Sequence, residues 1–188
     1  MNTGRVAEAI AWAEELHAGQ TRKGSRVPYL FHPLAVAAIV AEHGGGETEV
    51  IAALLHDAIE DGGGAPVRAH IASRFGAAVA AVVERCTDTD TTPKPPWRAR
   101  KEAFVAGLAD ADPATRLVVA ADKLHNARCT VRDLRREGEP VWGRFRGGRD
   151  GTLWYYRAVL EALAAGWTHP VLDELRVEVA ALARLGDA

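Results

Sequence analysis

The sequence of 188 residues predicts a single all-α domain. Alanine, leucine and valine recur at helical spacing along most of the chain, whereas the strict alternation that is typical of strands is scarce. Glycine and proline gather between these periodic stretches, as they do at the ends of helices. The length suits one domain, and no repeat or long linker divides residues 1–188. We therefore expect one helical bundle of roughly eight to ten helices.

The first part of the chain predicts two helices joined by a basic loop. Residues 3–18 place their apolar side chains on one helical face. The polar loop at residues 19–31 contains Pro28, which disfavours helix at the residue before it. Pro33 then occupies an expected first helical position, and the helix that it opens ends near His43, before three glycines.

The middle of the chain predicts one central helix and two shorter ones. The helix at residues 48–61 is almost wholly apolar in its middle, so we expect it to be buried on most sides. Two helices at residues 66–75 and 77–86 are separated by Gly76. Residues 87–96 are polar and contain prolines, which indicates a loop.

The last part of the chain begins its longest helix with a clear signal. Asp112 and Pro113 are a good capping residue and a good first helical residue. The remaining helices are expected at residues 97–108, 113–136 and 152–165, and after His169-Pro170.

Charge and composition exclude several classes of protein. The 23 basic and 25 acidic residues argue against a constitutive DNA- or RNA-binding protein, which carries a basic excess. A small phosphorylated ligand needs only a local cluster of cations. No apolar run reaches the ~20 residues of a membrane span, and the N-terminal region lacks the apolar core of a signal peptide. We expect a soluble cytoplasmic protein, and a homo-oligomer is compatible with the sequence.

The two cysteines carry no sign of a metal site or disulfide framework. Cys86 and Cys129 lie in apolar helical patterns and are not spaced like metal ligands. We expect a pair of reduced thiols in the core.

Two histidines and two aspartates are candidate ligands of one divalent cation. His56 and Asp57 are adjacent at the end of the most apolar helix, where polar groups are costly unless they are compensated. Imidazole and carboxylate together suit Mn²⁺, Fe²⁺ or Zn²⁺. His32 precedes a helix start, and Asp122 interrupts an apolar stretch. The structural alternatives are a solvated surface pair for His56-Asp57 and a salt bridge with Lys123 or an arginine for Asp122.

Other polar residues are candidates for catalysis and phosphate binding. Glu60 and Asp61 each follow a candidate ligand by four residues, so a continuous helix would place them on similar faces. Such carboxylates can orient water or accept its proton, although acids also solvate helix ends. Asn126 follows Asp122 by one turn and is expected to face the same site. The basic loop around Arg22 and Lys23, and also Lys94, offers cations for phosphates or is simply solvated.

Four segments together resemble a known family. They are HAGQTRKG at residues 17–24, PYLFHPL at residues 28–34, AALLHDAIED at residues 52–61 and ADKLHN at residues 121–126. Their order and spacing, over about residues 5–165, resemble the HD-type hydrolase domain of the RelA/SpoT superfamily. The chain is too short to add that family's synthetase domain, so it resembles the stand-alone small alarmone hydrolases of the Mesh type.

The resemblance implies a role for each candidate residue. It implies that the manganese ligands are His32, His56, Asp57 and Asp122, and that Glu60 and Asp61 serve the attacking water. It implies that Arg22, Lys23, Lys94 and Asn126 face the nucleotide, with Tyr155 as the aromatic residue lining that site. The implied reaction removes pyrophosphate from the ribose 3′ position of guanosine tetra- or pentaphosphate.

Departures from the family pattern leave the preferred base open. Three glycines, residues 62–64, follow the acidic pair where the family often has threonine and polar residues. Adenosine alarmones and other 3′-phosphorylated nucleotides are therefore alternatives. Two further alternatives are an HD-type nucleotidase that cleaves 5′-phosphates and a nucleotide-sensing module that has lost catalysis.

Overall fold

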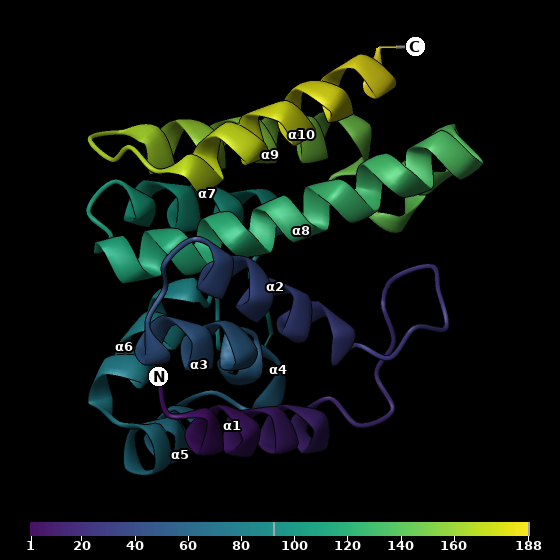
Figure 1. The fold of residues 1–188 in the computed structure, drawn as a ribbon. Coiled ribbons are helices and arrows are strands. Elements are labelled where there is room, and N and C mark those ends of the chain that lie inside the picture. The colour runs from purple at the N-terminus through teal and green to yellow at the C-terminus, as the bar shows by residue number, and fades with distance from the viewer. Residues whose placement is uncertain (92, 188) are drawn as a thin grey trace.

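The longest helix, α8 (Pro113–Glu137), lies in the middle of the molecule, between two groups of helices (Figure 1). The structure is a computed structural model that describes residues 1–91 and 93–187, without the side chain of Asp61. On one side of α8 lie α7 (Trp97–Leu108), α9 (Gly148–Ala164) and α10 (Pro170–Gly186). On the other side lie α1 (Thr3–Leu16), α2 (Phe31–Glu42), α3 (Glu47–Leu55), α4 (Ala58–Gly62), α5 (Ala65–Phe75) and α6 (Ala77–Cys86). Within the described residues there is no strand, only one isolated bridge, so the predicted all-α class is confirmed.

The apolar helix α3 is buried as its composition predicts. All of its residues from Val50 to Leu55 are buried, and α3 contacts α1, α2, α6 and α8. Burial on every side fixes its position firmly, because each side chain loses contacts if the helix shifts. The polar residues that directly follow α3 are therefore held at a fixed point beside α8.

The predicted helix at residues 48–61 is wrong in one respect, because it breaks at His56-Asp57. Helix α3 ends at Leu55, and α4 begins at Ala58. The His56 ring donates a hydrogen bond from Nδ1 to the carbonyl oxygen of Ala53, 2.8 Å away, which holds the ring against the last turn of α3. At this break, His56 Nε2 lies 3.7 Å from Asp122 Oδ1 of α8, and Asp57 Oδ2 lies 3.0 Å from the same nitrogen.

Three further boundaries differ from the prediction. Helix α2 begins at Phe31, so Pro33 lies within its first turn, where a missing N–H has no intrahelical partner to lose. The predicted loop after α8 contains a 3-10 helix, η1 (Glu139–Arg144). Helix α9 begins at Gly148 instead of residue 152. A Cβ on Gly147 would lie 2.6 Å from the Trp97 ring, so this glycine serves close packing and does not mark a loop.

Two polar side chains hold the N-terminal end of α8. The Asp112 side chain accepts a hydrogen bond from the backbone N–H of Thr115 at 2.9 Å, which confirms the predicted cap. The buried Arg116 guanidinium donates to the carbonyl oxygens of Ala109, Ala111, Leu163 and Ala165. Arg116 thereby satisfies carbonyls beyond the end of α7 and at the end of α9 with one side chain.

Arg116→Ala is expected to lower the free energy of unfolding by about 3 kcal/mol, because it leaves several buried carbonyl oxygens without a donor. Urea unfolding followed by circular dichroism measures the change. Arg176→Ala is the control, since Arg176 is an exposed residue of α10 whose ion pair with Asp173 contributes less than about 1 kcal/mol. Equal stability of the two variants would contradict the conclusion that the hydrogen bonds of Arg116 stabilise the fold.

Among the described residues, no helix is both long enough and apolar enough to cross a bilayer.

Candidate active site

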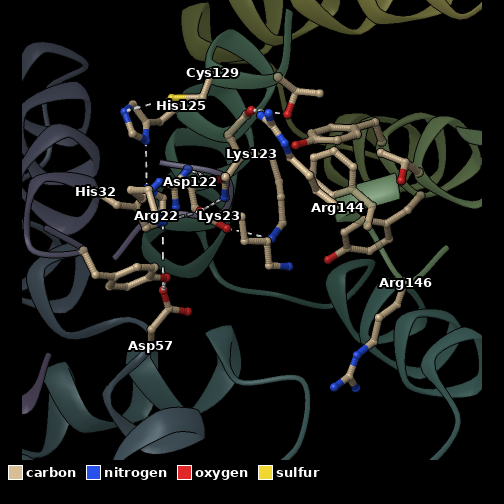
Figure 2. Close-up of a pocket in the computed structure, with 18 of the residues that line it drawn as sticks. Arg22, Lys23, His32, Asp57, Asp122, Lys123, His125, Cys129, Arg144 and Arg146 are labelled. Carbon is tan, nitrogen blue, oxygen red and sulfur yellow. Dashed lines mark hydrogen bonds and ion pairs between the residues drawn. The ribbon is translucent and has the colours of Figure 1, made fainter. Parts of the chain in front are cut away.

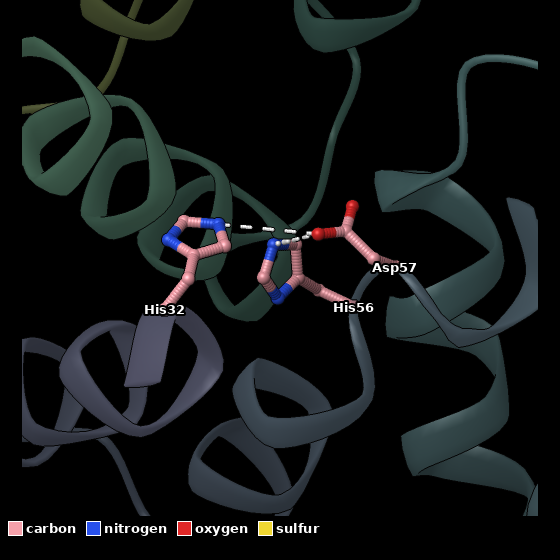
Figure 3. Close-up of side chains that lie close together, drawn as sticks. All are labelled: His32, His56 and Asp57. Atoms are coloured by element: carbon pink, nitrogen blue, oxygen red, sulfur yellow. Dashed lines mark ion pairs between the residues drawn. The ribbon is translucent and has the colours of Figure 1, made fainter. Parts of the chain in front are cut away.

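The four predicted metal ligands lie together between α2, the α3–α4 break and α8. His32 comes from the first turn of α2, His56 and Asp57 from the break, and Asp122 from the middle of α8. Ligand atoms of His32, His56 and Asp57 lie within 4.8 Å of one another and point toward a common centre (Figure 3). Residues about 90 positions apart in the chain thus meet at one point, as the motif order predicts.

The distances suit one cation. Asp122 Oδ1 lies 3.1 Å from His32 Nε2 and 3.7 Å from His56 Nε2. Asp57 Oδ2 lies 3.0 Å from His56 Nε2 and 3.9 Å from His32 Nε2. Ligands bound at about 2.1 Å to one ion are separated by roughly 3 to 3.5 Å. In addition, His56 Nε2 is buried and makes no hydrogen bond of good geometry within the described residues, and a metal ion bound to this nitrogen would compensate its burial.

Both imidazoles present the same nitrogen to this centre. Since His56 Nδ1 donates to a carbonyl oxygen, the lone pair of a neutral His56 ring is on Nε2. His32 Nδ1 lies 2.7 Å from His125 Nδ1, and His125 Nε2 lies 3.6 Å from Cys129 Sγ. Burial, together with nearby His32 and Arg22, lowers the pKa of His125 to about 4. A neutral His125 accepts a hydrogen bond from His32 Nδ1–H, which leaves the lone pair of a neutral His32 on Nε2, free to bind metal.

Asp122 lies beside the candidate ligand His32, and it also forms the salt bridge with Lys123 that was the alternative prediction. Its Oδ2 lies 2.6 Å from Lys123 Nζ, and its Oδ1 accepts a hydrogen bond from Asn126 Nδ2 at 2.5 Å. Burial raises the pKa of Asp122, but Lys123 and the two site histidines outweigh burial and lower it well below the usual value. The carboxylate is therefore ionised and fixed in direction.

The Asp57 carboxylate has a hydrogen-bond donor that the sequence did not reveal. The Tyr29 hydroxyl donates to Asp57 Oδ2. Burial and the neighbouring Asp57 raise the pKa of Tyr29, so the hydroxyl keeps its proton and remains a donor. Burial raises the pKa of Asp57, but His56 opposes burial and the net shift is downward.

His125→Ala is expected to weaken Mn²⁺ binding by about 10- to 100-fold, because the His32 ring loses the partner that fixes its orientation. Calorimetric titration of Mn²⁺ into the variant measures the change. His70→Ala is the control, since His70 is an exposed residue of α5 whose ring contacts Trp12. The His70→Ala variant should bind Mn²⁺ with the affinity of the wild type. If His125→Ala binds Mn²⁺ as tightly as the wild type, the hydrogen bond from His32 to His125 is not needed to orient the His32 ring.

The predicted metal ligands border a cavity of about 1260 Å³. The five predicted substrate-binding residues all line it: Arg22, Lys23, Lys94, Asn126 and Tyr155. So do several cations that were not predicted: Arg100, Lys101, Lys123, Arg132, Arg136, Arg144 and Arg146. Figure 2 shows Arg22, Lys23, Arg144 and Arg146 around this space, with Asp57 and Asp122 on its border. The lining also includes carboxylates, namely Asp57, Glu60, Asp88, Asp122, Asp133 and Glu137, but its cations outnumber them, so a polyanionic ligand fits the cavity.

The predicted catalytic acid Glu60 also lines the cavity, although the reason given for its position was wrong. His56 and Glu60 do not share a continuous helix, since Glu60 belongs to the separate helix α4. Its carboxylate lies 2.7 Å from Lys94 Nζ. Burial, and to a lesser extent Asp88, raises the pKa of Glu60, while Lys94 opposes this shift. The side chain of the second predicted acid, Asp61, lies outside the described part of the structure.

The predicted nucleotide residues come from different elements around the cavity. Arg22 Nη2 donates to Asn126 Oδ1 at 2.7 Å, which joins the basic loop to α8. Burial and the neighbouring cations lower the pKa of Lys23. Tyr155 extends from α9 into the lining of the same cavity, and its buried hydroxyl has no hydrogen-bond partner among the described residues. An unpaired buried hydroxyl at a cavity is suited to bind a ligand.

The expectation of two reduced core thiols is confirmed in part. Cys86 and Cys129 are free and Cys86 packs against the core, but both side chains are only half-buried and both line the cavity. Their helices are apolar toward the core, and the cysteines lie where those faces turn toward the open space. Burial raises the pKa of Cys86, so this thiol keeps its proton at neutral pH.

Comparisons with known proteins agree with the family resemblance seen in the sequence. An HD domain model matches residues 9–153. Guanosine-3′,5′-bis(diphosphate) 3′-pyrophosphohydrolase MESH1 of Homo sapiens is 36% identical over 146 residues, which cover 76% of each chain. The solved structure of lmo0812 from Listeria monocytogenes EGD-e has a TM-score of 0.71 and 32% identity, covering 79% of this chain and 96% of that one.

A metazoan ortholog of SpoT shares the fold over nearly the whole molecule. Its TM-score is 0.77, and the match covers 98% of this chain and 96% of that chain at 24% identity. The family model covers well over half of this chain, and the human relative is matched over three quarters of its length. The resemblance seen in the four sequence segments is thereby confirmed. The chain belongs to the HD-domain family and, within it, to the RelA/SpoT-related group that contains the MESH1 proteins.

Proposed function

We propose that this protein is a manganese-dependent hydrolase that removes pyrophosphate from the 3′ position of guanosine tetra- or pentaphosphate, leaving GDP or GTP. The observation that carries the proposal is the meeting of two imidazoles and two carboxylates at the border of a large cationic cavity. The human relative in the same family bears the name of such a 3′-pyrophosphohydrolase. We further propose that residues 1–188 act as one hydrolase domain.

The proposed ligands of the cation are His32, His56, Asp57 and Asp122. Nitrogen and oxygen donors without a thiolate suit Mn²⁺, as they do Fe²⁺ and Zn²⁺, and manganese is our choice because of the family resemblance. When bound, the cation supplies Lewis acidity, which polarises a phosphoryl oxygen and lowers the pKa of water.

Glu60 is the proposed general base. Hydrolysis breaks the bond between the ribose 3′ oxygen and the adjacent phosphorus. The oxygen of water becomes part of the released pyrophosphate, and one of its protons ends on the 3′ oxygen. Glu60 lines the cavity and has a raised pKa, which suits a group that accepts this proton and passes it on. Asp61 is proposed to share this task.

The cations of the cavity are proposed to bind the phosphates. Arg22 offers a planar fork to phosphate oxygens, whereas Lys23 and Lys94 act as mobile charges. Lys94 already contacts Glu60, so it lies where charge changes during the reaction. Asn126 from α8 and Tyr155 from α9 are proposed to contact the nucleoside.

A panel of nucleotides tests the proposal. The Mn²⁺-loaded protein is incubated with guanosine and adenosine 3′,5′-bis(diphosphates), 3′-monophosphates and nucleoside 5′-triphosphates, and the products are separated by ion-exchange chromatography. We expect GDP and pyrophosphate from the guanosine bis(diphosphate). Cleavage at the 5′ position alone would favour a nucleotidase, and binding without any product would favour a sensing module.

A further inference from the structure

A second ionic cluster lies beside Glu60, away from the predicted metal ligands. Arg100 Nη1 lies 2.6 Å from both carboxylate oxygens of Asp88, and Lys101 Nζ lies 2.5 Å from one of them. The side chains of Asp88 and Arg100 are only 3% and 7% exposed. All three line the cavity, and neither the family resemblance nor the proposed mechanism uses Asp88 or Arg100.

The cluster holds the connection between α6 and α7, of which the structure describes residues 87–91 and 93–96. Asp88 lies near its start, and Arg100 extends from α7, which follows it. Arg100 also donates from Nε to the carbonyl oxygen of Pro95, 3.2 Å away. One guanidinium therefore holds both ends of the connection against α7.

This connection carries Lys94, whose ammonium group contacts Glu60. Lys94 is the residue directly before Pro95, so the hydrogen bond from Arg100 fixes the backbone next to it. The Lys94 side chain is 37% exposed and is long, so its direction depends on where its backbone is held. Asp88 is also near enough to Glu60 to affect its charge.

Stability alone does not account for such a cluster. A buried ion pair is often no more stabilising than apolar side chains of the same volume, because both charges must be desolvated. Its directional bonds do, however, fix a geometry that apolar packing leaves adjustable. The geometry fixed here is that of Lys94 and Glu60.

We infer that Asp88 and Arg100 are positioning residues, which act through the α6–α7 connection to hold Lys94 against Glu60. The inference rests on the proposed function. Neither residue needs to touch the nucleotide.

A double-mutant cycle on the full Mn²⁺-loaded protein tests the inference. Asp88→Asn is expected to lower kcat by about 10- to 100-fold, with a smaller change in KM and no change in Mn²⁺ affinity. In a Lys94→Met background the same substitution should lower kcat by less than about threefold, because the contact that it supports is already absent. Equal effects of Asp88→Asn in both backgrounds would overturn the inference.

Two further measurements separate positioning from loss of structure. Loss of the Asp88 charge by itself lowers the pKa of Glu60, but displacement of Lys94 raises it, and the Lys94 contact has the larger effect. The acid limb of the pH–rate profile should therefore move to higher pH if Lys94 is displaced, and to lower pH if Lys94 stays in place. Glu102→Gln is the matched control, since Glu102 pairs with Arg98 on the exposed face of the same helix and should leave kcat and the profile unchanged. If Asp88→Asn does not fold, Arg100→Lys replaces it, because it keeps the charge but loses the fork.

Inorganic pyrophosphate gives a readout that does not need turnover. Its affinity for the Mn²⁺-loaded protein should fall about tenfold in Asp88→Asn and stay unchanged in Glu102→Gln, because a displaced Lys94 loses one charge contact with the anion. If the wild type cleaves no nucleotide, the proposed function fails and this binding assay alone decides the positioning role. Unchanged pyrophosphate affinity together with an unchanged rate would refute that role.

Discussion

Asp57→Ala is expected to abolish Mn²⁺ binding and nucleotide hydrolysis together, while the helical signal in circular dichroism stays largely intact. Asp57 Oδ2 lies 3.0 Å from His56 Nε2, and its removal takes one of two proposed anionic ligands from the cation. The Tyr29 hydroxyl loses its acceptor as well. Residue 57 lies between two helices, so the helices themselves do not depend on its side chain. Calorimetric Mn²⁺ titration and product chromatography measure the two losses.

Asp110→Ala is the matched control for this substitution. Asp110 is exposed in the connection between α7 and α8, so its removal should change neither metal affinity nor rate. Asp122→Ala should also abolish both activities, but it leaves the nearly buried Lys123 without its partner and should cost about 3 kcal/mol of stability. Full turnover in either ligand variant would remove the basis of the metal assignment.

Glu60→Gln is expected to keep Mn²⁺ affinity and to lower kcat by about 100- to 10,000-fold, which is the range for loss of a general base. Glutamine has nearly the same shape and still meets Lys94, so the loss reports proton transfer and not packing. Asp61→Asn is expected to act in the same direction. Steady-state kinetics at saturating nucleotide measures the effect.

The pH dependence gives a second test of Glu60. A general base must be ionised, so the rate should fall as pH drops through its pKa. Burial raises that pKa, and the acid limb should therefore lie above the range of an ordinary glutamate. The limb should vanish in Glu60→Gln, whereas the control Glu14→Gln, on the exposed face of α1, should retain it. An acid limb that persists in Glu60→Gln belongs to another group.

Much of the fold could be predicted because periodicity and helix-end signals act locally. The boundaries of α7 and the capped start of α8 follow from Trp97, Asp112 and Pro113 without reference to the rest of the chain. The break at His56-Asp57 could not be predicted in this way. It depends on packing of α3 and on the bond from His56 to the preceding turn, and no glycine or proline marks it.

The candidate site likewise contains residues that the sequence predicts and residues that only the structure reveals. The residues His32, His56, Asp57 and Asp122 belong to recognisable motifs, so they could be named before their distances were known. Tyr29 and His125 also lie within those motifs, but their roles arise from contacts with residues far away in the chain. The Asp88–Arg100 pair has a weaker signal, since nothing in its local sequence distinguishes it from surface charges. Only tertiary packing reveals that both side chains are buried.

Hydrolysis in water labelled with a heavy oxygen isotope tests most directly the central claim, that water attacks the phosphorus attached to the ribose 3′ oxygen. The Mn²⁺-loaded protein hydrolyses guanosine 3′,5′-bis(diphosphate) in water enriched in heavy oxygen, and mass spectrometry locates the label in the products. The account predicts labelled pyrophosphate and unlabelled GDP, because water attacks phosphorus and the 3′ oxygen stays with the ribose. Label in the nucleotide, or release of labelled orthophosphate in place of pyrophosphate, would contradict it.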